Sequence, residues 1–493
     1  MAVAAIVAFW NLAQAAAENR LRFEHCFVAP TLGPHVDIER APTTTAAEKS
    51  QSDSRVLFGR LEKAGAGTGS AVVVKSWFSA PPVTSALDYE AEAYRYVTEH
   101  AVLRGRTPAI APFLASGECL YDDVVAHARF GDATRREFER MRAKTLLDAV
   151  RAGSIEVSPA DRQRVLRGDP LAVARICAEK LPTLRMLATL SPCRSGAPCP
   201  TLLDFFKRRP AGVELLPILF SLAHTVDALA RIGVQHNDLH PQNVVFSSDE
   251  PGINLDTALA FVVAPANNET IRVPQDVRAL TPRNLPLAPF VFDWDRSFVA
   301  GLAMRNPSLE GRYCDGYGQC PRIDTSYDMY TLLYGALRSP ELMRELGGWL
   351  TPSDVDIARD QDARHAACES DFPGRCGARA RLWSKYPHRR RGLPLHPATF
   401  PSAADLIRRP IIANRFPLEN ARGHARFLLF APPGVDRERV RADIDQFLMA
   451  TRARAKLGEL AELAIPAPIS PPPTETIDPA TPPASAVEAL SSQ

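Results

Sequence analysis

The sequence predicts an α+β fold in which a small antiparallel sheet precedes a mainly helical region. Two β-branched runs, Arg55–Leu61 and Ala71–Trp77, flank the glycine-rich segment Gly65–Gly69, which is the pattern of a β-hairpin. Further along, Val213–Ile232 is strongly apolar over the length of a buried helix, and Ile323–Leu337 has the same character. Early strands followed by long helices favour the α+β class.

Between the hairpin and the long apolar helix, the patterns predict a helix over Ala86–Arg104, a strand and turn over Pro108–Tyr121, a charged helix over Phe130–Arg151, a buried strand over Leu171–Leu181 and a short helix over Thr201–Lys207. On the first of these helices, Glu90 lies on the same face as Tyr94 and Val97. The charges of Phe130–Arg151 are typical of a solvated helix face.

The composition excludes several classes of protein. The chain has 493 residues, and its 58 Lys and Arg nearly balance its 56 Asp and Glu, whereas a dedicated nucleic-acid binder has a clear basic excess. Apolar residues make up 46% of the chain, which excludes wholesale disorder. Nine cysteines, an odd number in so long a chain, do not match a secreted disulfide scaffold.

No stretch reaches the roughly 18–20 unbroken apolar residues that a membrane-spanning helix needs. The N-terminal run Ala2–Ala17 is interrupted by Asn11 and Gln14 and has no basic residue before it. We therefore expect an apolar helix packed on the body of the protein rather than a signal peptide. The small residues Ala13 and Ala15 resemble a cleavage site, which leaves secretion as the alternative.

One polar loop carries most of the chemistry. The long apolar helix leads into His236–Phe246, which holds a carboxylate at Asp238 and an amide at Asn243 before an apolar strand begins. About 50 residues later, the strand within Pro289–Arg296 delivers Asp293. A carboxylate that orients a hydroxyl, with an amide and a carboxylate that hold Mg²⁺, is what phosphoryl transfer requires.

Phosphoryl transfer also needs a cation for the nucleotide phosphates, and Lys75 is the candidate. It closes the strand that contains Val72–Val74, and Glu90 follows 15 residues later on the next helix. A strand lysine paired with a helix carboxylate supplies such a cation. Glu92 competes with Glu90, and we choose Glu90 because it shares the apolar face of its helix.

The loop His236–Asn243 and the later Asp293 resemble the protein-kinase-like family, and they look most like the divergent serine/threonine kinases of large DNA viruses. The resemblance covers roughly Arg55 to Phe416. It implies a two-lobed fold with a small antiparallel-sheet N-lobe and a mainly helical C-lobe. It also implies ATP and Mg²⁺ as cofactors, and transfer of the γ-phosphoryl group to a protein serine or threonine hydroxyl.

The resemblance implies a role for each candidate residue. Asp238 is the catalytic base, Lys75 holds the α- and β-phosphates, and Glu90 pairs with Lys75 to keep it in place. Asn243 and Asp293 bind the metal and the nucleotide, and Glu179 and Leu181 belong to the hinge that contacts adenine. His236 would be the structural histidine of the loop. Asp328 would be the buried acid that ties its helix to the loop, and helix capping is the ordinary alternative for this aspartate.

The sequence departs from the kinase pattern at several points. No Gly-x-Gly-x-x-Gly lies at the expected distance before Lys75, which leaves the glycine-free Ser50–Ser54 as the phosphate-covering loop. Residues Asp293–Asp295 read Asp-Trp-Asp in place of Asp-Phe-Gly, so the last one lacks the freedom of glycine at positive φ. Arg296–Pro321 contains no Ala-Pro-Glu, and His240 stands where many protein kinases carry a lysine that contacts the transferred phosphate.

Two other functions stay open. Residues 238–241, Asp-Leu-His-Pro, are also similar to aminoglycoside and choline phosphotransferases, whose acceptors are small molecules. The missing glycine loop favours a catalytically impaired pseudokinase scaffold instead. Against the scaffold, all five polar catalytic positions are filled. Against the small acceptor, Asp328 after a moderately long activation segment fits the protein-kinase layout better.

The predicted organisation is an N-terminal helix and loop extension at 1–54, an N-lobe at 55–181 with a helical insertion at about 130–170, a C-lobe at 182–416, a C-terminal helical extension at 417–465 and a disordered proline-rich tail at 466–493. We expect a protein substrate, no nucleic-acid partner and a cytoplasmic location (host cytoplasm or virion for a viral protein). The pairs Cys314/Cys320 and Cys368/Cys376 are spaced more loosely than known structural zinc loops, which favours free thiols over a zinc site.

Overall fold

The computed structural model describes residues 35–38, 54–63, 66–80, 85–127, 131–193, 199–247, 257–264, 270–285, 287–309, 321–337, 339–354, 356 and 400–464. The chain divides into two units, 1–448 and 449–493, and the site lies in the first. The predicted N-terminal helix, the cysteines at 314, 320, 368 and 376 and the proline-rich tail fall outside the described residues. So does the predicted covering loop, except for its last residue, Ser54.

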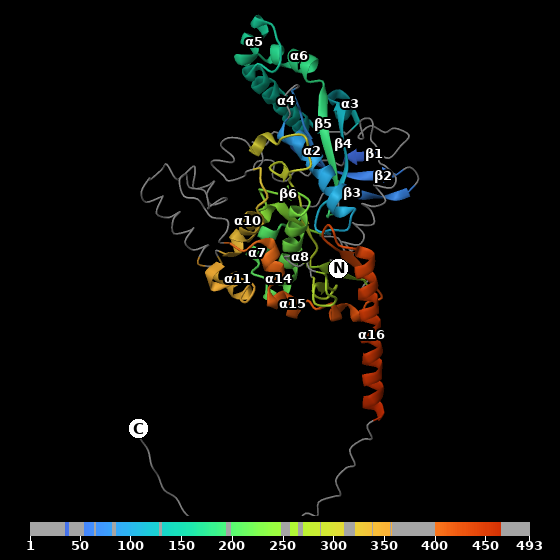
Figure 1. The fold of residues 1–493 in the computed structure, drawn as a ribbon. Helices are drawn as coiled ribbons and strands as arrows, with labels where there is room; N and C mark the ends of the chain where they lie inside the picture. The colour runs from blue at the N-terminus through green and yellow to red at the C-terminus, as the bar shows by residue number, and fades with distance from the viewer. Residues whose placement is uncertain are drawn as a thin grey trace, which may run out of the picture. The chain divides into compact units, whose positions relative to one another are not determined.

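A five-stranded antiparallel sheet in the order β1-β2-β3-β5-β4 forms the N-terminal region (Figure 1). Its strands are β1 (His35–Ile38), β2 (Arg55–Lys63), β3 (Ala66–Trp77), β4 (Phe113–Leu120) and β5 (Thr183–Leu190). Val72 and Val74 are buried in the core on one face, so alternation along β3 places Lys75 on the other face. The predicted hairpin is confirmed, but its turn is tighter than expected, because Lys63 pairs with Ala66.

Four helices lie between β4 and β5: α3 (Tyr121–His127), α4 (Asp132–Ala152), α5 (Pro159–Leu166) and α6 (Pro170–Lys180). The strand predicted at Leu171–Leu181 is therefore wrong, since this segment is helix α6. Asp169 accepts hydrogen bonds from the N–H groups of Leu171 and Ala172, and Pro170 takes the first helical position. This helix-start signal outweighs the apolar run that suggested a strand.

One buried arginine joins this insertion to the sheet. Arg142 on α4 donates from Nε to the carbonyl oxygen of Leu181 at 2.8 Å, just before β5 begins. Its guanidinium also stacks over the rings of Phe78 and Tyr121, at 5.7 and 4.9 Å from their centroids. The predicted charged helix thus presents at least one of its charges to the core rather than to water.

The later region is mainly helical, with α7 (Leu202–Lys207), α8 (Gly212–Ala230), α10 (Thr325–Leu337), α11 (Pro340–Glu345), α14 (Ala403–Arg408), α15 (Pro410–Arg415) and α16 (Arg437–Ala464). Helix α8 confirms the predicted apolar helix and is buried over most of its length. Within the described part of the chain, it alone has the length and hydropathy of a membrane span, and 83% of it is buried inside the protein. Such burial is typical of a core helix.

Short strands frame the polar loop. Strand β6 (Val234–Gln235) pairs with β11 (Phe298–Val299), and β7 (Val244–Phe246) pairs with β10 (Pro289–Val291). Both pairs are antiparallel. The strand before Asp293, β10, pairs with the strand after Asp238, β7, and the strand after Asp293, β11, pairs with the strand before Asp238, β6. The fold is thus a mixed α+β structure whose antiparallel sheet precedes a helical region, as the sequence predicts.

A three-stranded sheet is absent from the sequence prediction. Strands β8 (Thr257–Val262) and β9 (Val277–Leu280) form an antiparallel pair, and β12 (Arg426–Phe430) adds to β8 in parallel. The segment predicted as a C-terminal helical extension therefore contains a strand before its long helix. Alternate residues of all three strands pack with α16 in one apolar cluster that includes Ala260, Leu429 and Ile444.

The chain passes from the N-terminal sheet to the helical region between β5 and α7, over residues 191–201. A disulfide joins Cys193 to Cys199 in this connection. Cys193 is fully buried, so this end of the bridge lies in the protein interior. Within the described residues, Cys177 is the free thiol.

Candidate active site

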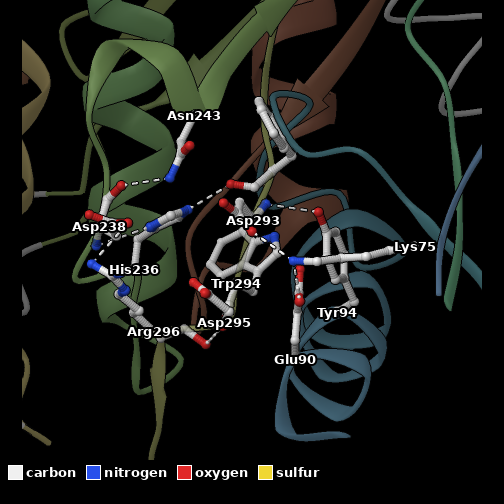
Figure 2. Close-up of polar contacts among 12 residues, drawn as sticks. Lys75, Glu90, Tyr94, His236, Asp238, Asn243, Asp293, Trp294, Asp295 and Arg296 are labelled. Carbon is white, nitrogen blue, oxygen red and sulfur yellow. Dashed lines mark hydrogen bonds and ion pairs between the residues drawn. The ribbon is translucent and has the colours of Figure 1, made fainter. Parts of the chain in front are cut away.

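Lys75 is the centre of an ion-pair cluster built from three elements. Its Nζ lies 2.6 Å from Oε2 of Glu90 on α2 (Ala86–Val97) and 2.9 Å from Oδ1 of Asp293, which follows β10 (Figure 2). The two carboxylates come from positions 15 and 218 residues away in the chain. The sheet, its neighbouring helix and the later region therefore meet at this ammonium group.

Electrostatics within this cluster favour a charged lysine. Burial disfavours the charge, but Asp293 and Glu90 outweigh it and raise the pKa of Lys75 well above its usual value. Burial raises the pKa of Glu90 to about 7, against the attraction of Lys75. Glu92, the competing candidate, instead forms an ion pair with Arg95 on the outer face of the same helix. The structure thus brings Glu90, and not Glu92, to Lys75.

Asp328, on helix α10, binds the backbone at the start of the polar loop His236–Phe246. Its two carboxylate oxygens accept the backbone N–H groups of His236 and Asn237, at 3.0 and 2.9 Å. Burial raises the pKa of Asp328 to about 8, although both N–H donors favour its charged form. Asp324, rather than Asp328, caps the start of α10, because its Oδ1 accepts the N–H of Tyr327. Asp328 therefore connects helix α10 to the polar loop, as the resemblance implied.

The loop is also joined to the strand that carries Asp293. His236 Nε2 lies 3.0 Å from the carbonyl oxygen of Phe292, and Phe292 donates its N–H to the carbonyl oxygen of Asn243. Within the loop, Asn243 Nδ2 donates to the carbonyl oxygen of Asp238 at 2.9 Å. Both Asp238 and Asn243 are buried. Figure 2 shows Asp293 with this loop on one side and Lys75 and Glu90 on the other.

Aromatic side chains connect the two halves of the site behind these polar groups. The fully buried Trp294 packs edge-on against Tyr94 of α2 and lies 4.7 Å from the imidazole of His236. The Tyr94 hydroxyl accepts the N–H of Asp293 at 2.9 Å, and the Tyr89 hydroxyl accepts the N–H of Val299 at 2.9 Å. These hydroxyl contacts were not predicted, since the sequence suggested only an apolar role for Tyr94.

Asp293 has a strained backbone, with φ at 69°. A non-glycine residue in the left-handed region costs of order 1–3 kcal/mol, and such residues cluster at functional sites. Here the cost is offset by the ion pair to Lys75 and by the hydrogen bond from its N–H to Tyr94. The residue with this backbone conformation is thus the one whose carboxylate pairs with Lys75.

The hinge prediction for Glu179 and Leu181 is wrong. Glu179 lies on α6 and Leu181 follows it, both before β5, whereas the chain leaves the sheet only after Leu190. The error has the same cause as the misassigned strand, because the segment counted as the last strand is a helix of the insertion. Beyond Leu190, the disulfide between Cys193 and Cys199 follows before helix α7 begins.

The site contains two oxygen-bearing side chains, Asp293 and Asn243, of the types that bind Mg²⁺. No cluster of three or more His, Cys, Asp or Glu side chains suited to a metal ion occurs in the part of the chain that the structure describes. Mg²⁺ is usually held by one or two carboxylates together with substrate phosphates and waters. The Asp293 carboxylate and the Asn243 amide oxygen are ligands of that kind, so the residues present fit the ion.

Asp295, at the position where the kinase pattern has glycine, is a carboxylate in surroundings that disfavour its charged form. Its Oδ1 is buried and has no hydrogen-bond partner among the described residues. Burial, assisted by the neighbouring Asp293, raises the pKa of Asp295 from 3.8 to about 8. The folded chain therefore keeps a proton that the unfolded chain releases, and this contribution to stability is lost as the pH rises from about 4 to about 8.

Replacing Asp295 with asparagine is expected to remove this loss. The midpoint of thermal unfolding should then exceed that of the wild type by more at about pH 8.5 than at about pH 5.5, with about 1–3 kcal/mol gained at the higher pH. Asp148→Asn, at an exposed carboxylate on α4, serves as the control and should show no such trend. A stability difference for Asp295→Asn that is the same at both pH values would contradict the prediction.

Comparisons with known proteins add little. No family model matches the chain, and no curated protein matches it. A solved structure described as the crystal structure of Rad53 kinase domain and SCD2 is similar over 73% of this chain and 87% of its own, with 12% identity and a TM-score of 0.29. This is a weak likeness to a protein kinase domain. At this TM-score it carries no argument about the function of the chain.

Proposed function

We propose that this chain is a protein serine/threonine kinase that transfers the γ-phosphoryl group of ATP to protein hydroxyls with Mg²⁺. The observation that carries the proposal is the placement of Lys75 between Glu90 and Asp293, 2.6 and 2.9 Å from their oxygens. A lysine fixed by a helix carboxylate and a metal-binding aspartate is the arrangement that activates protein kinases. The loop with Asp238 and Asn243 is joined directly to the strand that carries Asp293.

Each residue has a task that follows from its surroundings. Lys75 offers a fixed ammonium group to the nucleotide phosphates, and Glu90 keeps it from turning away. Asp238, held by the anchored loop, accepts the proton of the substrate hydroxyl and orients its oxygen. Asn243 and Asp293 would hold Mg²⁺, which neutralises charge on the phosphates when bound.

The test measures transfer of labelled γ-phosphate onto generic protein substrates and onto small alcohols. Asp238→Asn is expected to lower kcat by about 10²–10⁴-fold, because a general base contributes that much, while nucleotide binding in a thermal-shift assay persists. Asp227→Asn, at a shielded acid on α8 that pairs with Arg231, is the matched control and should keep its activity.

Three outcomes separate the alternatives. Labelled protein that disappears in Asp238→Asn supports the proposal. Labelled small alcohol without labelled protein would show a phosphotransferase of the aminoglycoside or choline kinase type. A wild-type chain that neither transfers phosphate nor binds nucleotide would support the third alternative, a pseudokinase scaffold.

A further inference from the structure

Arg296 is the charged residue that reaches the proposed base from the segment after Asp293. Its Nη1 lies 3.6 Å from Oδ2 of Asp238 (Figure 2). His240 faces the same oxygen, with its Nε2 at 3.9 Å. The Arg296 side chain is 26% exposed and that of Asp238 only 4%, so the guanidinium lies between the buried carboxylate and solvent. An acceptor hydroxyl that approaches Asp238 therefore meets this cation as well.

The backbone on either side of Arg296 is held in place. Asn306 Nδ2 donates to the carbonyl oxygens of Asp295 and Ser297, at 3.0 and 2.8 Å, and these two residues flank the arginine. The Ser297 hydroxyl donates to the carbonyl oxygen of Trp294 at 2.8 Å, and Asn306 and Ser297 are both buried. The backbone from which the Arg296 side chain extends is therefore fixed, which is a requirement for a functional group.

The chemistry of arginine suits a second anion at this place. The contact of its Nη1 with Oδ2 of Asp238, at 3.6 Å, is an ion pair. A guanidinium has five N–H donors in a planar fork, so it can face a phosphoryl group without leaving the carboxylate. It also keeps its charge throughout the physiological pH range, whereas a histidine such as His240 is charged only when protonated.

Resting on the proposed kinase function, we propose that Arg296 binds the phosphoryl group during its transfer, from its place 3.6 Å from the Asp238 carboxylate. In that step the acceptor oxygen forms a bond to the γ-phosphorus, and the bond from phosphorus to the β,γ-bridging oxygen breaks, leaving its electron pair on ADP. The hydroxyl proton passes to the Asp238 carboxylate. Arg296 forms no covalent bond and donates hydrogen bonds to the non-bridging phosphoryl oxygens.

The experiment compares steady-state transfer by the full chain and three variants, Arg296→Ala, Arg296→Lys and Arg231→Gln. We expect Arg296→Ala to lower kcat by about 10²-fold with little change in KM for ATP, because the interaction forms only as the phosphoryl group moves. Arg296→Lys should recover part of this loss. Added guanidinium ion at millimolar concentration should restore activity to Arg296→Ala but leave the wild type unchanged.

Arg231→Gln is the matched control, because Arg231 is a partly exposed arginine that also pairs with a shielded aspartate, Asp227. Its kcat should stay at the wild-type value. An Arg296→Ala variant that keeps its kcat, or that becomes faster because a blocking contact is removed, would overturn the inference while leaving the kinase function intact. A wild-type chain without any transfer would instead overturn the proposed function itself.

Discussion

Replacing Lys75 with methionine is expected to reduce phosphoryl transfer by about 10²–10³-fold, the usual effect of removing one fixed charge that stabilises a transition state. The free energy of unfolding should also fall by about 3 kcal/mol, because the change leaves two carboxylates facing each other without their cation. Glu90 is only 1% exposed, so water cannot replace the lysine. Steady-state kinetics and chemical unfolding measure the two effects separately.

A double variant separates the two effects. In Lys75→Met with Glu90→Gln, the buried carboxylate at position 90 is neutral, so the stability should recover in part while transfer stays low. Because Lys75 lowers the pKa of Glu90, its removal raises that pKa further, so protonation of Glu90 relieves part of the penalty in the single variant at neutral pH. A double variant less stable than Lys75→Met would show that the two carboxylates do not repel each other as described.

Replacing Asp328 with asparagine is expected to lower the free energy of unfolding by about 2–3 kcal/mol. One oxygen of the new amide can still accept an N–H group, but its NH₂ group must face the other donor, from His236 or Asn237. Because this loop carries the proposed base, kcat should fall by at least about tenfold, since small misplacements of a catalytic group are costly.

The control for this prediction lies on the same helix. Asp324→Asn keeps a side chain that caps helices as well as aspartate does, so both stability and kcat should change little. Urea unfolding and transfer rates are measured on the two variants side by side. If Asp324→Asn and Asp328→Asn lose the same stability and activity, the loop is not anchored through Asp328 in particular.

Local spacing explains why part of the site could be predicted. Asp238 and Asn243 share one loop, and Lys75 and Glu90 lie 15 residues apart on consecutive elements, β3 and α2, so the chain itself brings each pair together. The contacts of Tyr89 and Tyr94 with Val299 and Asp293 join segments about 200 residues apart. No local pattern marks a tyrosine whose hydroxyl, rather than its ring, will find such a distant partner.

The errors in the prediction have physical causes. Short apolar runs such as Leu171–Leu181 fit a strand or a helix equally well, and the decision came from Asp169 and Pro170, which start a helix. The hinge was misplaced as a result. Strand β12 was not predicted, and its partner β8 lies about 170 residues earlier in the chain, so no local pattern indicates the pairing.

The parallel pairing of β12 with β8 also bears on how the protein is made. Thr257 pairs with Arg426, about 170 residues later, so a nascent chain presents β8 long before its neighbour leaves the ribosome. During that interval β8 has an open edge, although every proposed catalytic residue has already been synthesised by the time β12 appears. A translation product that stops before Arg426 would keep this edge exposed and would tend to aggregate with other chains.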